Sequence, residues 1–122
     1  GQDLVVFRDS DGRLGILDEK CPHRGASLAF GRNEKCGLRC LYHGWKFDVS
    51  GKVLDMASEP PHSRLDTRVK ARAWPVVEHS GFVWAWLGDP ERPATFDPPA
   101  WASAPTERIS IVKMHAACNW AQ

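Results

Sequence analysis

The sequence of 122 residues lacks a long apolar run, a segment patterned like a signal peptide, a low-complexity stretch and an internal repeat. These absences leave no argument for insertion into a membrane or for export. The formal net charge is only +1 and no known nucleic-acid-binding module is present, so a nucleic-acid partner is not expected. What remains, 43% hydrophobic residues with six Trp, predicts one globular domain. A chain of this length buries roughly two thirds of its unfolded surface and does not need a metal merely to fold.

Cysteine is also scarce, with four residues, and two of these stand near histidines. One residue separates Cys21 from His23, two separate Cys40 from His43, and sixteen lie between the pairs. Zinc could use two thiolates and two imidazoles, but a zinc finger usually takes both Cys from one segment and both His from the other. Two mixed segments favour a binuclear centre in which one iron takes the thiolates and the other the imidazoles, as in a Rieske [2Fe-2S] cluster.

The neighbouring residues agree with that interpretation. Gly25 and Gly44 allow tight turns around a bulky cluster, and Pro22 stiffens the first loop. The motifs CPHRG and CxYHGWKFD resemble the Rieske domain of ring-hydroxylating oxygenases, and residues 21–60 are similar to its phthalate dioxygenase-like branch. The resemblance implies an all-β Rieske iron-sulfur fold of small antiparallel sheets with a cluster-binding loop subdomain. The implied cofactor is a [2Fe-2S] cluster whose ligands are Cys21, His23, Cys40 and His43.

The resemblance further implies electron transfer through this cluster to a non-haem iron oxygenase centre, in an enzyme that hydroxylates or O-demethylates aromatic compounds. The chain has no convincing 2-His-1-carboxylate triad for that Fe(II), so no catalytic residue is assigned and the oxygenase centre is expected in a missing catalytic domain. Expected partners are a reductase or ferredoxin electron donor and a neighbouring subunit of a homotrimer. Iron-sulfur assembly needs a reducing compartment, which favours the cytoplasm. The alternatives are a stand-alone Rieske-type ferredoxin that only carries electrons and a structural zinc module.

Turn residues divide the first part of the chain into short expected strands. Residues 4–7 and 14–17 are predicted to form a hairpin that leads into the first ligand loop, because Asp9–Gly12 between them is a turn signal. Gly31–Lys35 is polar and is predicted to be a turn. Gly37–Leu41 is predicted to be the strand that delivers the second ligand loop.

Later in the chain, Asp48–Gly51 predicts another hairpin turn. Two longer strands, Val69–Glu78 and Phe82–Leu87, are predicted to join at residues 79–81. Alternation along the second of these strands places three aromatic residues on one face, where they are expected to pack in the core: Phe82, Trp84 and Trp86.

The predicted domains are a Rieske [2Fe-2S] domain at residues 1–88 and, at residues 89–122, a Pro-rich linker with the start of a connection to the missing catalytic domain. A further strand is expected over Arg108–Met114. The sequence has no initiator Met, and residues 118–122 are similar to the segment where oxygenases of this family enter the catalytic domain. The chain is therefore interpreted as the Rieske part of an oxygenase α subunit, truncated at both ends.

The ligand set also predicts the reduction potential. Two thiolates and two neutral imidazoles give an oxidised cluster of zero charge, which accepts an electron more easily than an all-Cys cluster. High-potential respiratory Rieske proteins resemble this site but carry a Ser, a Tyr and two further Cys where this chain has Trp45, Phe47, Ala26 and Tyr42. Without hydroxyl donors at positions 45 and 47, the potential is expected near the low end of the Rieske range of roughly −150 to +300 mV.

The remaining cysteines and histidines are not interpreted as metal ligands. Cys36 precedes Cys40 by four residues and is interpreted as a small buried hydrophobe on the same strand, and Cys118 is interpreted likewise. A disulfide between Cys36 and Cys118 is the alternative. Three histidines show no ligand-like spacing and are interpreted as ordinary surface or core residues: His62, His79 and His115.

Positive charge gathers around the expected ligands. Residues 20–46 hold six basic side chains against one acid, a balance of +5, so the rest of the chain carries −4 of the total +1. These basic residues are either a docking face that steers an acidic redox partner or ordinary solvated side chains. They are Lys20, Arg24, Arg32, Lys35, Arg39 and Lys46.

Overall fold

A computed structural model describes residues 1–60, 62–89, 91–92 and 95–117 of the protein. The regular structure of these residues is β, with single turns of 3-10 helix between strands. The strands are β1 (Leu4–Arg8), β2 (Leu14–Asp18), β3 (Arg32–Glu34), β4 (Gly37–Arg39), β5 (Trp45–Phe47), β6 (Val53–Met56), β7 (Val76–His79) and β8 (Phe82–Ala85). The 3-10 turns are η1 (Leu28–Phe30), η2 (Leu65–Thr67), η3 (Ala100–Ser103) and η4 (Thr106–Arg108).

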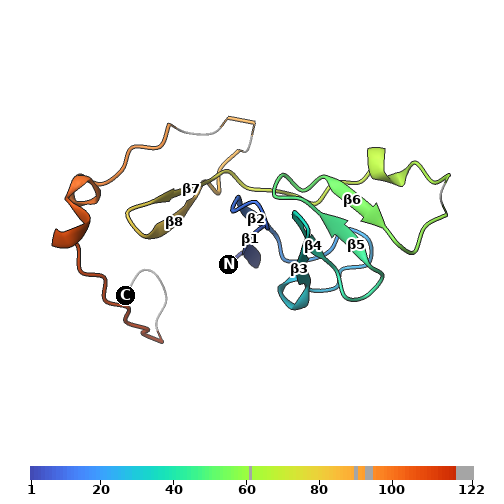
Figure 1. The fold of residues 1–122 in the computed structure, drawn as a ribbon, viewed down its shortest axis with the longest axis horizontal. Coiled ribbons are helices and arrows are strands. Elements are labelled where there is room, and N and C mark those ends of the chain that lie inside the picture. Colours follow the sequence, from blue (N-terminus) through green and yellow to red (C-terminus); the bar gives the residue numbers. More distant parts are fainter. Residues whose placement is uncertain (61, 90, 93–94, 118–122) are drawn as a thin grey trace.

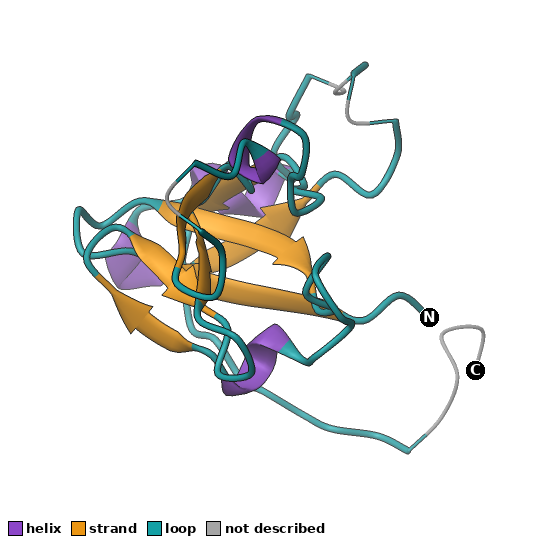
Figure 2. Cartoon of the chain, turned by 90° about the vertical axis from the view of Figure 1, so that its right-hand side faces the viewer, coloured by secondary structure: helices purple, strands orange, loops and turns teal. Residues whose placement is uncertain are grey.

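The strands form small antiparallel sheets, as predicted. β1 pairs with β2, β7 pairs with β8, and the four strands between them form one sheet in the order β3-β4-β5-β6 (Figure 1). In the cartoon of Figure 2 the strands are joined mainly by loops and turns rather than by long helices. The predicted all-β fold is therefore confirmed.

Two hairpin turns are fixed by the same local device. The carboxylates of Asp9 and Asp48 each accept the backbone N–H groups two and four residues further along, at 2.8–3.0 Å. Gly12 and Gly51 follow three residues after these aspartates, with φ angles of +80° and +81°. Both turns were predicted from their Asp and Gly residues, and both are confirmed.

One hydrophobic core packs the first two sheets against the ligand loops. Alternate residues of β1 and β5 point into it, as the period of a strand requires. Two of the predicted ligands, Cys21 and Cys40, are themselves core residues, so the predicted site is anchored in the best-packed part of the molecule. The core consists of Val5, Phe7, Leu17, Cys21, Leu28, Leu38, Cys40, Trp45, Phe47, Val53 and Ala71.

Two sequence predictions in this region are wrong. Arg32–Glu34, expected to be a turn, is strand β3, and the turn is confined to Lys35 and Cys36, whose φ angles are +30° and +61°. The expected strand Val69–Glu78 is limited to β7. Residues 71–74 instead make 2.9 Å backbone hydrogen bonds to β2 on one side and to Gly51 on the other, so they tie the first two sheets together rather than extending β7.

β7 and β8 form a separate hairpin at the other end of the molecule (Figure 1). Its turn lies at Ser80 and Gly81, with φ angles of +53° and +77°, close to the predicted position. The aromatic residues of β8 do not join the main core. Trp84 packs instead against Phe96 and Trp101 of the tail, with ring centroids 5.7 and 6.2 Å apart.

The tail folds back over this hairpin. Ala102 of η3 is buried, and its carbonyl accepts a 2.6 Å hydrogen bond from the Ser80 hydroxyl. The expected strand over Arg108–Met114 is wrong, because residues 109–114 pair with no strand among the described residues. The tail therefore makes packing contacts that a free linker would lack, while the division of the chain at residue 88 stays a prediction.

Candidate metal centre

Two loops, defined here as loop 1 (residues 21–26) and loop 2 (residues 40–45), share one backbone frame. In each loop the Cys N–H donates to the carbonyl five residues on, at 2.8 Å. The Cys carbonyl accepts from the glycine four residues on, at 2.8 Å in loop 1 and 3.1 Å in loop 2. Those glycines, Gly25 and Gly44, have φ angles of +70° and +76°, which favour a residue without Cβ.

The four predicted ligands differ in burial, and the difference follows their chemistry. The thiols of Cys21 and Cys40 are each only 3% exposed. The imidazoles of His23 and His43 are half-buried, with ring centroids 4.7 Å apart and ring planes at 67°. The structure thus brings all four side chains together, with the two cysteines in the core and the two imidazoles less buried.

Burial has a strong effect on the Cys21 thiol. It raises the pKa of Cys21 to about 11, and the facing Cys40 thiol adds to this, whereas the backbone N–H groups of His23 and Arg24 act in the opposite direction. In the chain without a metal, Cys21 is therefore protonated at neutral pH. Binding of a metal there must release this proton, since the thiolate is the ligand.

Aromatic side chains support both imidazoles. The indole of Trp45, which is 2% exposed, lies parallel to the His23 ring at 4.6 Å between centroids. The Tyr42 ring, on the exposed side, lies 3.8 Å from that of His43. The Trp45 Nε1–H donates to the hydroxyl of Ser58 at 3.1 Å. Sequence reasoning noted position 45 only for its missing hydroxyl, because spacing gives no sign that a loop 2 residue stacks on a loop 1 imidazole.

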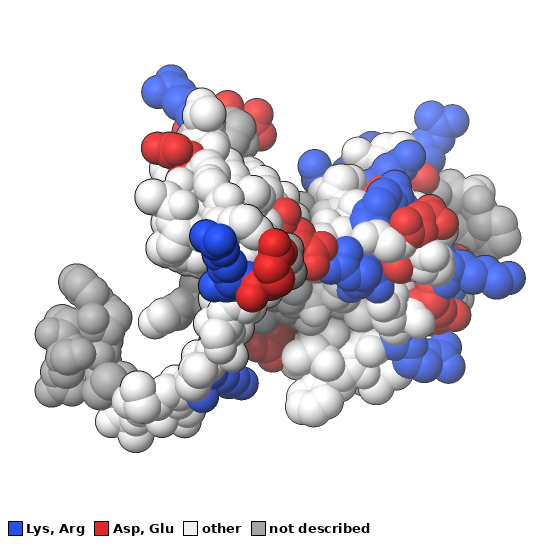
Figure 3. All heavy atoms as spheres, turned by 60° about the vertical axis from the view of Figure 1, so that its left-hand side comes forward, with Lys and Arg blue, Asp and Glu red and all other residues white. Residues whose placement is uncertain are grey.

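The basic residues around the loops do not act as one set. Arg39 lies between the carboxylates of Glu34 and Asp55, and its side chain is only 16% exposed. Burial alone would lower the pKa of Arg39, but these two carboxylates raise it, and Arg39 in turn lowers the pKa of Glu34. Lys35 lies in the turn at the opposite end of β4 from loop 2. Figure 3 shows basic and acidic atoms interspersed on its visible face. A docking face made of all six basic residues stays a prediction.

The position and burial of Cys36 differ from those predicted. It lies in the β3–β4 turn rather than on a strand and is half-buried. Its N–H donates to the Ser10 hydroxyl at 2.7 Å and its thiol to the Asp11 carboxylate at 3.1 Å. The interpretation as a buried hydrophobe is therefore wrong. Cys118 lies outside the described residues, so its predicted burial and the alternative disulfide stay predictions.

The other histidines lie apart from the loops. His62 and His115 are exposed, and His79 lies against Phe96 at 5.8 Å between ring centroids. Among the residues that the structure describes, no group of three or more His, Cys, Asp or Glu is arranged to hold one ion. A Rieske cluster needs two protein ligands at each iron, which two pairs can provide.

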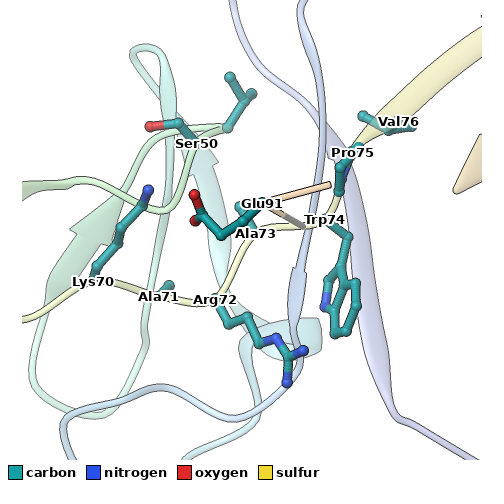
Figure 4. A pocket seen from close by; sticks show the side chains of 10 residues that line it. Ser50, Lys70, Ala71, Arg72, Ala73, Trp74, Pro75, Val76 and Glu91 are labelled. Carbon is teal, nitrogen blue, oxygen red and sulfur yellow. The ribbon is translucent and has the colours of Figure 1, made fainter. Parts of the chain in front are cut away.

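The candidate centre is a pair of loops rather than a cavity. A hollow of about 550 Å³ lies elsewhere, between the turn at residues 49–50, the connector at residues 70–76 and Glu91. Figure 4 shows its side chains, among them Lys70, Arg72 and Glu91, and no predicted ligand lines it. In the described part of the chain, no helix is both long and apolar enough to cross a membrane.

Paired loops that gather two thiols and two imidazoles on an all-β scaffold define a class of small metal-binding β-domains. Within that class, residues 1–75 match the Rieske [2Fe-2S] domain family, and the chain belongs to this family. Residues 85–122 match a second family, described as LigXa C-terminal domain like. The family cofactor is a [2Fe-2S] cluster. The donor set fits it, because two facing thiols and two adjacent imidazoles can serve two different irons.

Known proteins similar to this chain are oxygenase subunits. The phthalate 4,5-dioxygenase oxygenase subunit of Pseudomonas putida is 56% identical over all of this chain, which spans 28% of that protein. The 5,5'-dehydrodivanillate O-demethylase oxygenase subunit of Sphingobium sp. is 38% identical over all of this chain and 29% of its own length. The structure of apo dicamba monooxygenase has a TM-score of 0.62 and 34% identity over 74% of this chain and 27% of its own. The resemblance to ring-hydroxylating oxygenases, inferred from the motifs, is confirmed.

Proposed function

We propose that the chain passes single electrons through a Rieske [2Fe-2S] cluster to a non-haem iron oxygenase centre, in an enzyme that hydroxylates or O-demethylates an aromatic compound. The ligands in this proposal are Cys21 and Cys40 at one iron and His23 and His43 at the other. The observation that supports it most is that two loops with the same backbone hydrogen bonds carry two buried, facing thiols and two half-buried, adjacent imidazoles.

The bound cluster supplies a reversible one-electron couple. The residues around it keep the sulfur side in the core, away from water, and turn the imidazoles of His23 and His43 toward the surface. Leu41 and Tyr42 at the tip of loop 2 are 59% and 64% exposed. They provide an apolar contact beside the imidazoles, through which a docked partner exchanges electrons.

The partners follow from the relatives, which are named as subunits of dioxygenase and demethylase systems. A reductase or ferredoxin delivers the electrons, and the acceptor is an Fe(II) site carried by polypeptide outside these 122 residues, in a neighbouring subunit of a homotrimer. This arrangement works in the cytoplasm and involves neither nucleic acid nor a membrane.

A stand-alone electron carrier is the second candidate. It is favoured by the hydrophobic core, whose members all come from residues 5–71, so the cluster loops are held without the tail. The similarity of the whole chain, residues 85–122 included, to oxygenase subunits favours the oxygenase. The iron content of the full-length gene product distinguishes them, because an oxygenase holds a mononuclear iron in addition to the cluster, whereas a carrier holds only the two irons of the cluster.

The first test is low-temperature EPR of the dithionite-reduced protein, purified without air, with iron and sulfide counted on the same sample. The proposal expects a rhombic signal with an average g below that of all-Cys clusters, and two irons and two sulfides per chain. An EPR-silent protein that holds one zinc would overturn it.

A further inference from the structure

We propose that Arg39 is a positioning residue for loop 2, whose guanidinium fixes the Gly44 peptide and thereby the arrangement of both imidazoles around the cluster. This inference rests on the ligand assignment proposed above. Sequence reasoning counted Arg39 only as one of six basic residues, and its contacts assign it a different role.

The Arg39 side chain joins three parts of the molecule. It leaves the end of β4 directly before loop 2, and its Nε donates to the carboxylate of Glu34 on β3. Its Nη1 donates to the carboxylate of Asp55 on β6 at 2.8 Å and to the carbonyl oxygen of Gly44. Arg39 therefore precedes loop 2 in the chain and also holds the peptide near its far end.

The position of the Gly44 peptide affects the orientation of both imidazoles. Gly44 stands between His43 and Trp45, and Trp45 stacks on His23 of the other loop. The Gly44 N–H is bonded to the Cys40 carbonyl, so the Arg39 contact completes the fixation of this residue on its carbonyl side. If that contact is lost, the orientation of one imidazole changes directly and that of the other changes through the indole.

Only an arginine suits this geometry. A planar guanidinium offers five N–H donors in a fixed fork and can bond two carboxylates and a carbonyl together, whereas a lysine ammonium on a flexible stem holds fewer of them in place. Loop 1 has Lys20 at the matching position, and that residue is exposed. Beside loop 1, a side-chain hydrogen bond instead joins Ser27 to Glu19, and neither residue belongs to the loop.

The neighbouring Arg32 provides a matched control. It lies opposite Arg39 in the β3–β4 pairing and contacts the same Glu34 carboxylate at 3.5 Å, but its side chain is 68% exposed. Arg32→Met therefore removes the same charge from the same strand pair without touching loop 2.

The experiment compares three variants, Arg39→Met, Arg39→Lys and Arg32→Met, in the cluster-loaded protein. Two quantities are measured: the rate of iron release to a chelator and the g values of the reduced cluster. We expect Arg39→Met to release iron on the order of tenfold faster, with shifted and broadened g values, since charge-assisted hydrogen bonds are lost. Arg39→Lys should lie between Arg39→Met and the parent, and Arg32→Met should match the parent in both readouts.

A fourth variant covers the case in which Arg39→Met does not fold because Glu34 and Asp55 lose their partner. The triple change Glu34→Gln, Asp55→Asn and Arg39→Met leaves no carboxylate without its Arg39 partner, and the only charge that loses a contact is that of Arg32, which is 68% exposed. This variant should still release iron faster. Parent-like iron release and g values in the triple variant, or equal results for Arg39→Met and Arg32→Met, would overturn the inference alone. A parent protein without two irons and a rhombic signal would overturn the proposed function as well.

Discussion

Loop 1 and loop 2 have the same backbone frame but are held by contacts of different range. Around loop 1, the Ser27 hydroxyl bonds Glu19, and the Leu28 N–H bonds the Glu19 carbonyl at 2.7 Å, so these hydrogen bonds lie within residues 19–28. Around loop 2, Arg39 reaches Asp55 and the Trp45 indole reaches Ser58, on the neighbouring strand β6 and beyond it. A substitution near loop 2 should therefore affect more distant residues than a substitution near loop 1.

Substitution of a proposed ligand should have the largest effect, and the effect should be similar in the two loops. His23→Cys and His43→Cys each add a negative charge at the same proposed iron, so both should lower the midpoint potential toward the roughly −400 mV of all-Cys plant-type clusters. Redox titration followed by EPR measures this shift. His62→Ala, at an exposed histidine, is the control and should change nothing. Equal shifts in all three variants would mean that the proposed ligand set is wrong.

Trp45→Leu should affect both loops through one residue. The substitution removes a buried indole, its stack on His23 and its bond to Ser58. We expect a loss of about 3 kcal/mol in the free energy of unfolding, measured with urea, together with altered g values.

Tyr42→Leu is the matched control for Trp45→Leu, because its ring also lies against an imidazole but is 64% exposed. It should cost less than about 1 kcal/mol. If both variants lose the same stability, the indole does not support loop 1 in the way that the structure indicates.

The contrast between local and long-range contacts also explains how much the sequence could predict. The turns at Asp9 and Asp48 depend on bonds within five residues, and both were predicted from the sequence. The four Cys and His residues were brought together by spacing and motif, and the loops do place them side by side, although their role as ligands stays a prediction.

The features that were not predicted from the sequence depend on contacts with residues that are distant in the chain. The polar segment Arg32–Glu34 is a strand only because β4 pairs with it, and residues 71–74 divide their hydrogen bonds between two sheets. The β-prone segment 109–114 has no strand partner in the described residues, so local propensity alone was misleading there. Arg39 shows the same limit, because its charge was visible in the sequence but its contact with Gly44 was not.

The two loop glycines give a smaller and more selective test. Gly25 and Gly44 have similar positive φ angles, so an alanine at either site is strained by about 1 kcal/mol. A Cβ at Gly44 would also lie 3.0 Å from the Ala57 Cβ, whereas a Cβ at Gly25 would have nothing within 4 Å. We therefore expect urea unfolding to show a loss of about 1 kcal/mol for Gly25→Ala and about 2 kcal/mol for Gly44→Ala. Equal losses would contradict the tighter packing of loop 2.

Ser27→Ala tests a side-chain contact that lies beside loop 1 and outside both loops. Ser27 caps η1 by accepting the Ala29 N–H at 3.2 Å, and its hydroxyl also bonds Glu19, so its loss should cost about 1 kcal/mol in urea unfolding. Ser50→Ala, at an exposed hydroxyl that bonds only within its own turn, is the control. The g values should stay those of the parent in both variants, because neither hydroxyl bonds a residue of loop 1 or loop 2, whereas Arg39 bonds Gly44 inside loop 2. A g shift for Ser27→Ala as large as that for Arg39→Met would mean that loop 1 depends on its side-chain support as much as loop 2 does, and the distinction between the two loops would fail.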